Sequence, residues 1–291
     1  MIDQFFTLPV QKQLSPAVSQ CQIADLPVLV ITHPQGQAAI TLQGAHLLSW
    51  QPTGQKPVIW LSSETAFQHG VAIRGGVPIC WPWFGPAGKP SHGFARNLPW
   101  QLTAQSEDDE KVQLTLTLKD SAETRKHWPH AFTLHAHFTF GEQCTIELES
   151  HGDFETTSAL HAYFDIGDIN TVSVEGLGQS YIDKVLNGEK AVLNGPLTFV
   201  GETDRIFIEP EAESLIVDPA LNRTIFVKHH GNSDVVSWNP GPANSASMKD
   251  MADEGYKTMV CVETAAVTHS QISTENAPAR LAITFGVQKD A

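Results

Sequence analysis

Regular alternation of apolar and polar residues is the feature that most constrains the fold of this chain. Residues 112–119 and 132–140 carry an apolar side chain at nearly every second position, with polar side chains between them. Because successive side chains of a β-strand point to opposite faces, each segment predicts a strand with one buried face. Residues 144–149 follow a short Gly-Glu-Gln spacer and predict the second strand of a hairpin.

Further short strands are predicted between turns rich in Gly, Pro, Asn and Asp. They are expected at 27–32, 39–49, 158–164, 205–208, 224–228, 234–238, 258–263 and 281–287. Helical periodicity is weak, with a short turn of helix expected at 121–130 and at 246–254, and the acidic run 107–110 is typical of a solvated hairpin loop. Many short strands without long helices between them predict an all-β sandwich or barrel. The sequence has no repeat and no low-complexity linker, so residues 1–291 are expected to form a single domain.

Composition and charge exclude several classes of protein. The net charge of -14 argues against nucleic acid or an anionic membrane as a partner, and an anionic substrate would need local cations. No secretory signal is expected from the first residues, and no apolar stretch of the sequence is long enough to span a membrane. Cys21, Cys80, Cys144 and Cys261 are far apart, which is typical of reduced buried thiols. These features predict a cytoplasmic protein.

The most unusual segment is 71–86, which carries three prolines, three glycines and three large aromatic residues around one arginine. Each proline removes a donor from a strand ladder, so an irregular path is predicted here. Arg74 and Arg96, two of only six arginines, fall in or just after this segment. Aromatic planes suit the faces of a sugar ring, and guanidinium groups suit phosphate or carboxylate. A proline-rich edge packed on the core, with both arginines in structural salt bridges, fits the composition equally well.

Two predicted strands each carry a titratable group among apolar neighbours. His161 is expected on the same strand face as Ala159 and Tyr163, and Glu263 ends an apolar run. A histidine and a carboxylate on facing strands would form a general acid–base pair. Each residue alone is more typical of a structural role, and the sequence does not show that the two side chains face each other.

Other polar and aromatic residues give weaker signals. Asp204 precedes a strand, where a turn-forming role is the simpler interpretation, and Trp238 adjoins a turn as either a ring platform or a core edge. His135 and His137 share a strand face, but no third ligand at a characteristic spacing accompanies them, so no metal is expected. The chain has no nucleophile-elbow, phosphate-loop or dinucleotide motif.

Taken together and in this order, several segments resemble the glucose-6-phosphate 1-epimerases. These are the hexose-6-phosphate mutarotase branch of the aldose 1-epimerase (galactose mutarotase-like) superfamily. The segments are 43–46, 74–86, 92–96, 161–164, 203–205, 238–240 and 262–264. The resemblance runs from about residue 8 to residue 287, and its Arg-Gly-Gly and His-Gly-Phe-Ala-Arg motifs are specific to the branch.

The resemblance implies a large antiparallel β-supersandwich with an open sugar cleft and no cofactor. His161 and Glu263 match the catalytic residues of the family, and Arg74 and Arg96 match residues at the phosphate end of the substrate. The candidate substrate-binding residues are Arg74, Arg96, Asp204, Ser91, His92 and Trp238.

The expected reaction interconverts the α and β anomers of D-glucose 6-phosphate, and of related hexose 6-phosphates, by ring opening and closure. Glu263 is assigned as the base at the anomeric hydroxyl, and protonated His161 as the acid at the ring oxygen. The two arginines supply the local cations that a dianionic phosphate needs.

Two alternatives remain at this stage: a mutarotase for unphosphorylated hexoses, and a non-catalytic carbohydrate-binding protein. A glycoside hydrolase is disfavoured because the sequence offers no convincing pair of carboxylates. A small-molecule sugar phosphate is the expected partner, and a monomer is the favoured oligomeric state.

Overall fold

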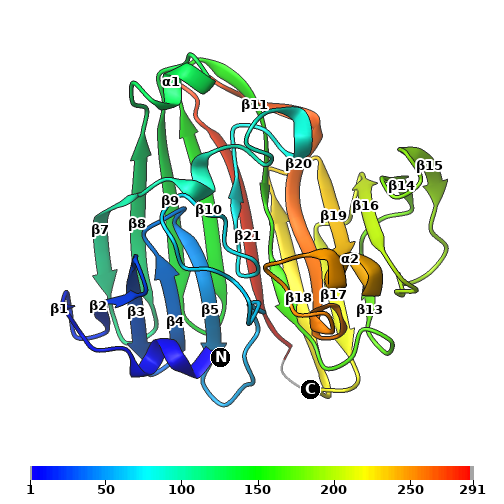
Figure 1. Ribbon diagram of the computed structural model, residues 1–291, viewed down its shortest axis with the longest axis horizontal. Coiled ribbons are helices and arrows are strands. Elements are labelled where there is room, and N and C mark those ends of the chain that lie inside the picture. The colour runs from blue at the N-terminus through cyan, green and yellow to red at the C-terminus, as the bar shows by residue number, and fades with distance from the viewer. Residues whose placement is uncertain (1, 289–291) are drawn as a thin grey trace.

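A computed structural model describes residues 2–288, and antiparallel β-strands are its main regular elements (Figure 1). The strands are β1 (Lys12–Gln13), β2 (Val18–Ile23), β3 (Leu26–His33), β4 (Gly36–Thr41), β5 (His46–Pro52), β6 (Ile79–Cys80), β7 (Gln101–Glu107), β8 (Val112–Lys119), β9 (Thr133–Phe140), β10 (Cys144–His151), β11 (Phe154–Leu160), β12 (Tyr163–Asp165), β13 (Ser173–Glu175), β14 (Ser180–Asp183), β15 (Glu189–Val192), β16 (Thr203–Ile208), β17 (Glu213–Asp218), β18 (Arg223–His230), β19 (Asp234–Asn239), β20 (Met259–Ser273) and β21 (Ala279–Val287). The short helical segments are η1 (Ile2–Thr7), η2 (Gly85–Ala87), η3 (Ala95–Asn97), α1 (Thr124–His127), α2 (Gly241–Ser247) and η4 (Gly255–Thr258).

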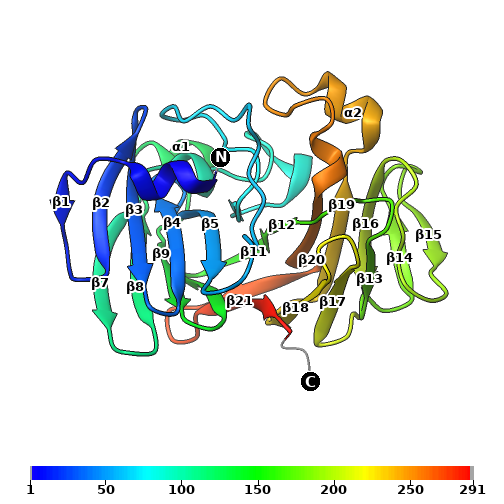
Figure 2. The same ribbon diagram turned by 90° about the horizontal axis from the view of Figure 1, so that it is seen from below.

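The strands form three sheets. A five-stranded sheet has the order β1-β2-β3-β4-β5, and an eight-stranded sheet has the order β13-β17-β18-β21-β10-β9-β8-β7. The third sheet, which we call the cleft sheet, has the order β15-β14-β16-β19-β20-β11-β6, with β12 paired to β20. The five-stranded sheet lies against β7–β9 in both views (Figures 1 and 2). The predicted all-β antiparallel sandwich is therefore confirmed.

All three sheets contribute to one hydrophobic core. Trp50 of β5 and Phe164 of β12 both pack edge-to-face on Phe285 of β21, with ring centroids 5.4 Å apart in each pair. These three residues come from the five-stranded sheet, the cleft sheet and the eight-stranded sheet. Such aromatic pairs contribute about 0.5–1.5 kcal/mol beyond the area they bury, so the contact at Phe285 fixes how the sheets meet.

Alternation of apolar and polar residues predicted the strands well where one face of the strand is buried. β8 has the predicted bounds, β9 and β10 match closely, and the acidic run 107–110 lies in the hairpin between β7 and β8. Side chains along β9 and β10 alternate between buried and half-exposed. Eight strands lie outside every predicted strand range: β1, β2, β6, β7, β13, β14, β15 and β17. Of these, β2, β7 and β17 mix polar residues into both faces.

Four predicted boundaries were wrong. The segment 39–49 forms two strands, β4 and β5, joined by a tight turn. The segment 158–164 is interrupted at 161–162, and β20 continues ten residues beyond Glu263. Its second half pairs with β11 past an irregularity in register and is largely polar, so hydrophobicity could not reveal it. Helix α2 ends at Ser247, so most of the expected turn 246–254 lies beyond it.

The cysteine prediction is confirmed, because all four thiols are free and buried. The short turn of helix expected at 121–130 is confirmed, because α1 lies within this range. The irregular path expected at 71–86 is also confirmed, because this segment contains only the two-residue strand β6 and the start of η2. Among residues 2–288, no helix has the length and apolar character needed to cross a membrane.

The irregular path after Arg74 depends on two glycines. Gly75 and Gly76 have φ values of +100° and +69°, which side chains rarely adopt. A Cβ added at Gly76 would lie 2.2 Å from the Leu47 carbonyl oxygen and 2.5 Å from Nε2 of His46. Only glycine therefore lets the chain pass this close to β5.

We expect Gly76→Ala to lower the free energy of unfolding by about 3 kcal/mol, because left-handed strain adds to overpacking against β5. Gly54 is a matched control: its φ is +77°, but a Cβ there would meet no atom within 4 Å. Gly54→Ala should therefore cost only about 1–2 kcal/mol. Urea unfolding of both variants measures the difference, and equal losses would contradict the close approach at Gly76.

Candidate active site

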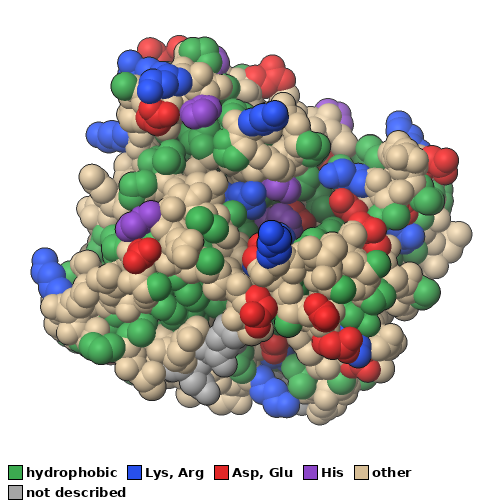
Figure 3. Space-filling model, in the orientation of Figure 1, with side chains coloured by type: hydrophobic (Ala, Val, Ile, Leu, Met, Phe, Trp, Pro, Cys, Tyr) green, Lys and Arg blue, Asp and Glu red, His purple; other side chains and the backbone are tan. Residues whose placement is uncertain are grey.

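Six of the residues singled out from the sequence line one small cleft, with a volume of about 150 Å³. They come from the irregular segment 71–86, from the loop between η2 and η3, from the break between β11 and β12, and from β16, β19 and β20. The full lining is Arg74, Phe84, His92, His161, Lys184, Asp204, Val236, Trp238 and Glu263. Basic, acidic and histidine side chains gather in a hollow near the middle of the face shown in Figure 3.

His161 and Glu263 face each other across the base of this cleft. His161 follows the end of β11, where its amide donates to the Pro78 carbonyl, 3.0 Å away. Tyr163 of β12 pairs with Cys261 of β20, and this register brings the imidazole opposite Glu263. Nε2 of His161 lies 3.3 Å from Oε1 of Glu263. A proton donor and a proton acceptor are therefore adjacent.

Burial shifts both members of the pair toward their neutral forms. Only 8% of His161 and 1% of Glu263 is exposed. Desolvation lowers the pKa of His161 well below its usual 6.5, and the nearby charges of His92, Arg96 and Arg74 add to this effect. Desolvation also raises the pKa of Glu263 well above 4.5, and Asp204 adds to it. The carboxyl group of Glu263 is therefore favoured in its protonated form, and the imidazole of His161 in its neutral form.

Each member of the pair also has a buried polar atom with no hydrogen-bond partner in the described protein. These atoms are Nδ1 of His161 and Oε2 of Glu263. Buried polar atoms without partners are rare and costly, and they commonly mark functional sites. Both side chains therefore lack a hydrogen bond that a buried polar group usually makes.

Aromatic rings hold the imidazole of His161 in place. It stacks on Tyr163, with ring centroids 4.8 Å apart and an interplanar angle of 9°. Tyr163 in turn stacks on Trp60 at 5.9 Å, while Trp238 meets His161 edge-on at 6.1 Å. The ring orientation is thus fixed by packing, and Trp238 gives the cleft an apolar wall.

Arg74 extends into the cleft but is already paired. Its Nη2 and Nε lie 3.1 and 3.2 Å from Oδ2 of Asp250, and Nη1 donates to the Tyr163 hydroxyl at 3.2 Å. Tyr163 and Asp250 hold the pKa of Arg74 above its usual value against the effect of burial. The guanidinium group therefore makes a structural salt bridge and also lies in the cleft wall. From the sequence, a structural salt bridge and a binding role were alternatives.

Lys184 is a cleft residue that the sequence analysis missed. It follows β14, and its amide donates to the Asp204 carbonyl, 2.8 Å away on β16. Its Nζ lies 3.6 Å from Oδ2 of Asp204. Burial raises the pKa of Asp204, and the charge of Lys184 opposes that shift. No motif surrounds Lys184, so only the pairing of β14 with β16 reveals its position.

Ser91 and Arg96 are not among the residues that line the cleft. Ser91 is exposed, and its carbonyl accepts a hydrogen bond from Nη2 of Arg96 at 2.9 Å. The Nε of Arg96 is buried without a hydrogen-bond partner in the described chain. Arg96 nevertheless lies close enough for its charge to act on His92 and His161. It is a cation beside the cleft rather than in its wall.

His92 contacts both the irregular segment 71–86 and His161. Its Nδ1 accepts a hydrogen bond from the Gly85 amide at 3.3 Å, and its ring centroid lies 5.7 Å from that of His161. Burial, with the charges of Arg96, Lys184 and Arg74, lowers the pKa of His92 to about 3. His92 therefore stays neutral at physiological pH and can act as a hydrogen-bonding group.

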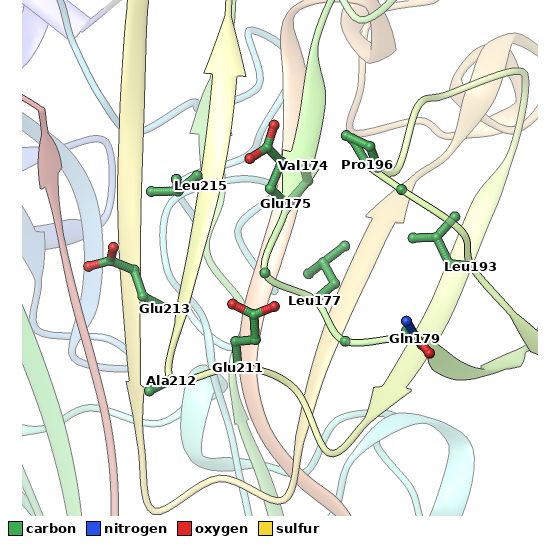
Figure 4. Close-up of a pocket in the computed structure, with 13 residues that line it drawn as sticks. Val174, Glu175, Leu177, Gln179, Leu193, Pro196, Glu211, Ala212, Glu213 and Leu215 are labelled. Atoms are coloured by element: carbon green, nitrogen blue, oxygen red, sulfur yellow. The ribbon is translucent and has the colours of Figure 1, made fainter.

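A second, larger cavity of about 690 Å³ lies between β13, β17 and the segment around Leu193 (Figure 4). Glu175, Glu211 and Glu213 project around it, and none of its described lining residues is Lys, Arg or His. Size alone would favour this cavity as a ligand site. Its three carboxylates disfavour an anionic ligand, so the smaller cleft suits a sugar phosphate better.

The ligand atoms of His161, Cys261 and Glu263 lie within 4.8 Å of one another, a set that could hold a metal ion. Burial raises the pKa of the Cys261 thiol well above 9.0, with Glu263 adding to the shift, so this thiol is protonated at neutral pH. The charge of Arg74 also reaches both Cys261 and His161. A protonated thiol and a neighbouring guanidinium group make this position unfavourable for a cation.

The sequence profile of the aldose 1-epimerase family matches residues 27–278. A relative from Salmonella typhimurium, named provisionally as a glucose-6-phosphate 1-epimerase, is 58% identical over 99% of this chain and 100% of its own length. An Escherichia coli K12 relative with the same provisional name is 56% identical over the same shares.

The crystal structure of a protein from Salmonella typhimurium, provisionally titled a mutarotase, is 58% identical. It superposes with a TM-score of 0.98 and covers 100% of both chains. This match confirms the predicted mutarotase-like fold. By both sequence and structure, the chain belongs to the aldose 1-epimerase family.

Proposed function

We propose that this protein interconverts the anomers of hexose 6-phosphates, with D-glucose 6-phosphate as the substrate. The observation that carries the proposal is the buried His161–Glu263 contact of 3.3 Å in a cleft that Arg74 and Lys184 also line. The provisional names of the Salmonella typhimurium and Escherichia coli relatives support the same substrate.

The two catalytic residues supply both proton transfers that ring opening requires. His161 takes the proton of the anomeric hydroxyl, whose oxygen forms the aldehyde as the bond from C1 to the ring oxygen breaks. Glu263 gives its proton to that ring oxygen. Charge is conserved, because the neutral pair becomes an imidazolium and a carboxylate.

Ring closure reverses both transfers. After rotation about the C1–C2 bond, Glu263 takes back the proton of the ring hydroxyl, which attacks the other face of the aldehyde. His161 then returns its proton to the aldehyde oxygen. The sequence-based assignment is the reverse: it starts with ionised Glu263 at the anomeric hydroxyl and protonated His161 at the ring oxygen. Burial favours the opposite distribution in the free site.

We propose that Arg74 and Lys184, two cations that line the cleft, bind the phosphate. Arg96 contributes its charge from beside the cleft, and Asp204, His92 and Trp238 contact the sugar. Arg74 is well placed because its salt bridge with Asp250 is partly exposed, so a phosphate oxygen can share or replace that carboxylate. Ser91, which is exposed at the rim, fits a looser contact with the substrate.

A mutarotase for unphosphorylated hexoses is the second candidate, and one observation favours it. Both cations of the cleft wall already have carboxylate partners, Arg74 with Asp250 and Lys184 with Asp204. In the free protein these pairs leave little net positive charge for a phosphate. The two candidates differ in whether removal of Arg74 affects only the phosphorylated sugar.

We also propose that the chain is one domain acting in the cytoplasm. A single core cluster draws residues from all three sheets, which supports one domain. Four free, buried thiols suit a reducing compartment.

We expect Glu263→Gln and His161→Asn each to lower kcat for anomer exchange by at least about 100-fold, because each removes one proton transfer. The double variant should be little worse than either single variant, since the two residues act together. Anomer exchange of glucose 6-phosphate, followed by NMR or polarimetry, measures the rates. Glu175→Gln, in the larger cavity, is the matched control and should keep normal turnover. Normal turnover in either folded catalytic variant would remove it from the mechanism.

The pH profile of kcat/KM should be bell-shaped. Activity requires neutral His161, so it falls on the acid side as the imidazole gains a proton at its lowered pKa. It requires protonated Glu263, so it falls on the alkaline side as the carboxyl group loses its proton at its raised pKa. The residual activity of Glu263→Gln should therefore lose the alkaline limb.

Loss of the acid limb instead would identify Glu263 as the initial base, as the sequence analysis assigned it. The phosphate of the substrate has a second pKa of about 6, which overlaps the acid limb. Glucose, if it reacts at all, provides a control without that ionisation.

Arg74→Ala should raise KM for glucose 6-phosphate about tenfold to a hundredfold, because charge-assisted hydrogen bonds contribute about 1.5–3 kcal/mol. Arg96→Ala should have a smaller effect, since Arg96 lies outside the cleft wall. Turnover of glucose should respond little to either variant. Asp250→Asn is the control for the salt bridge: it should lower stability without raising KM. A rise in KM for glucose as large as that for glucose 6-phosphate would favour the second candidate.

A further inference from the structure

A second group of titratable side chains lies on the eight-stranded sheet and takes no part in the cleft. We call it the outer cluster. It comprises His135 and His137 of β9 and Glu147, Glu149 and His151 of β10. All five residues are half-exposed, while the residues between them along each strand are buried. The cluster therefore occupies the solvent-facing side of the sheet.

Strand pairing brings these five side chains together. His137 is directly opposite Glu147, and His135 is opposite Glu149. One ligand atom from each of His137, Glu147 and Glu149 lies within 4.8 Å of the other two. The ring of His135 lies 5.9 Å from that of His137 and 5.4 Å from that of His151. Three imidazoles and two carboxylates thus share one small area.

Hydrogen bonds from the neighbouring strand hold two of the imidazoles. Nδ1 of His137 lies 3.0 Å from the Thr115 hydroxyl, and Nδ1 of His135 lies 2.9 Å from the Thr117 hydroxyl, both on β8. Histidines that bind metals usually have one ring nitrogen held in this way, which leaves the other nitrogen for the ion.

One cation already neutralises part of the cluster. Nε of Arg280 on β21 lies 2.7 Å from Oε2 of Glu149 and 3.8 Å from Oε1 of Glu147. His151 also contacts Glu149 through Nε2. More than half of the Arg280 side chain is exposed, so it can move into solvent without leaving a buried charge. Two carboxylates against one guanidinium group leave a net negative site that a divalent cation would suit.

We propose that the outer cluster binds Zn²⁺, with His137, Glu147 and Glu149 as ligands and Arg280 as the resident cation that the metal displaces. Imidazole together with carboxylate is a donor set that suits zinc, whereas magnesium prefers oxygen ligands alone. The spacing along the sequence did not reveal this site, because the additional ligands come from the paired strand. The site is separate from the proposed catalytic pair and does not depend on the proposed function.

The test is a calorimetric titration of the full, untagged chain with Zn²⁺ at pH 7.5. We expect one site on the outer cluster, weakened at least tenfold by His137→Ala or Glu149→Gln. Thr115→Val should weaken it about tenfold or more, because it frees the ring of His137 without removing a ligand. Arg280→Ala should bind Zn²⁺ more tightly than the wild type, which a merely structural cluster does not predict. Mg²⁺ should give no comparable binding.

His69→Ala is the matched control, since it removes an exposed histidine outside the cluster and should leave binding unchanged. Melting curves without metal confirm that each variant is folded. Absence of Zn²⁺ binding to the wild type, or equal binding to wild type and His137→Ala, would overturn the proposal. So would binding that survives in His137→Ala and is lost in His161→Asn, because the ion would then occupy the cleft. Weaker binding by Arg280→Ala would overturn the displacement of that side chain.

Discussion

Desolvation of one carboxyl group and one imidazole governs the arrangement of the cleft. Glu263 and His161 are almost fully buried at hydrogen-bonding distance, and each keeps a polar atom without a protein partner. In water their pKa values would leave the carboxylate ionised, whereas burial moves the shared proton toward it. Because either distribution of this proton has the same total charge, the proton can move in both directions without creating a net charge. Reversible ring opening and closure need this property.

The other charged residues of the cleft are arranged so that they do not favour one position of this proton. Arg74 and Lys184 bring positive charge close to a neutral pair, yet each is matched by a carboxylate, Asp250 or Asp204. An unmatched cation would stabilise the ionised form of Glu263 and make it a weaker base. The same pairing keeps the cleft nearly neutral in a chain of net charge -14. A bound phosphate can take over from these carboxylates as the partner of Arg74 and Lys184.

Much of the fold was predictable, because a strand with one buried face alternates apolar and polar residues along the sequence. β8 and β10 show this alternation. The site was predictable only in part. His161 and Glu263 were found through their motifs, but their contact depends on the pairing of β12 with β20. Glu263 was placed at a strand end, whereas β20 continues well beyond it. Lys184 carries no motif, and its place beside Asp204 comes from long-range pairing of β14 with β16.

The cleft and the outer cluster use the same residue types for different chemistry, and burial accounts for the difference. In the cleft, desolvation keeps histidine and glutamate neutral, so that pair suits proton transfer rather than cation binding. On the outer face, Arg280 and His151 hold the pKa of Glu149 low against desolvation, so the carboxylate stays ionised. Imidazole together with carboxylate is a donor set that suits a zinc ion. The sequence alone does not show which histidine–glutamate pair is buried and which is exposed to solvent. The packing of the sheets around each pair determines that exposure.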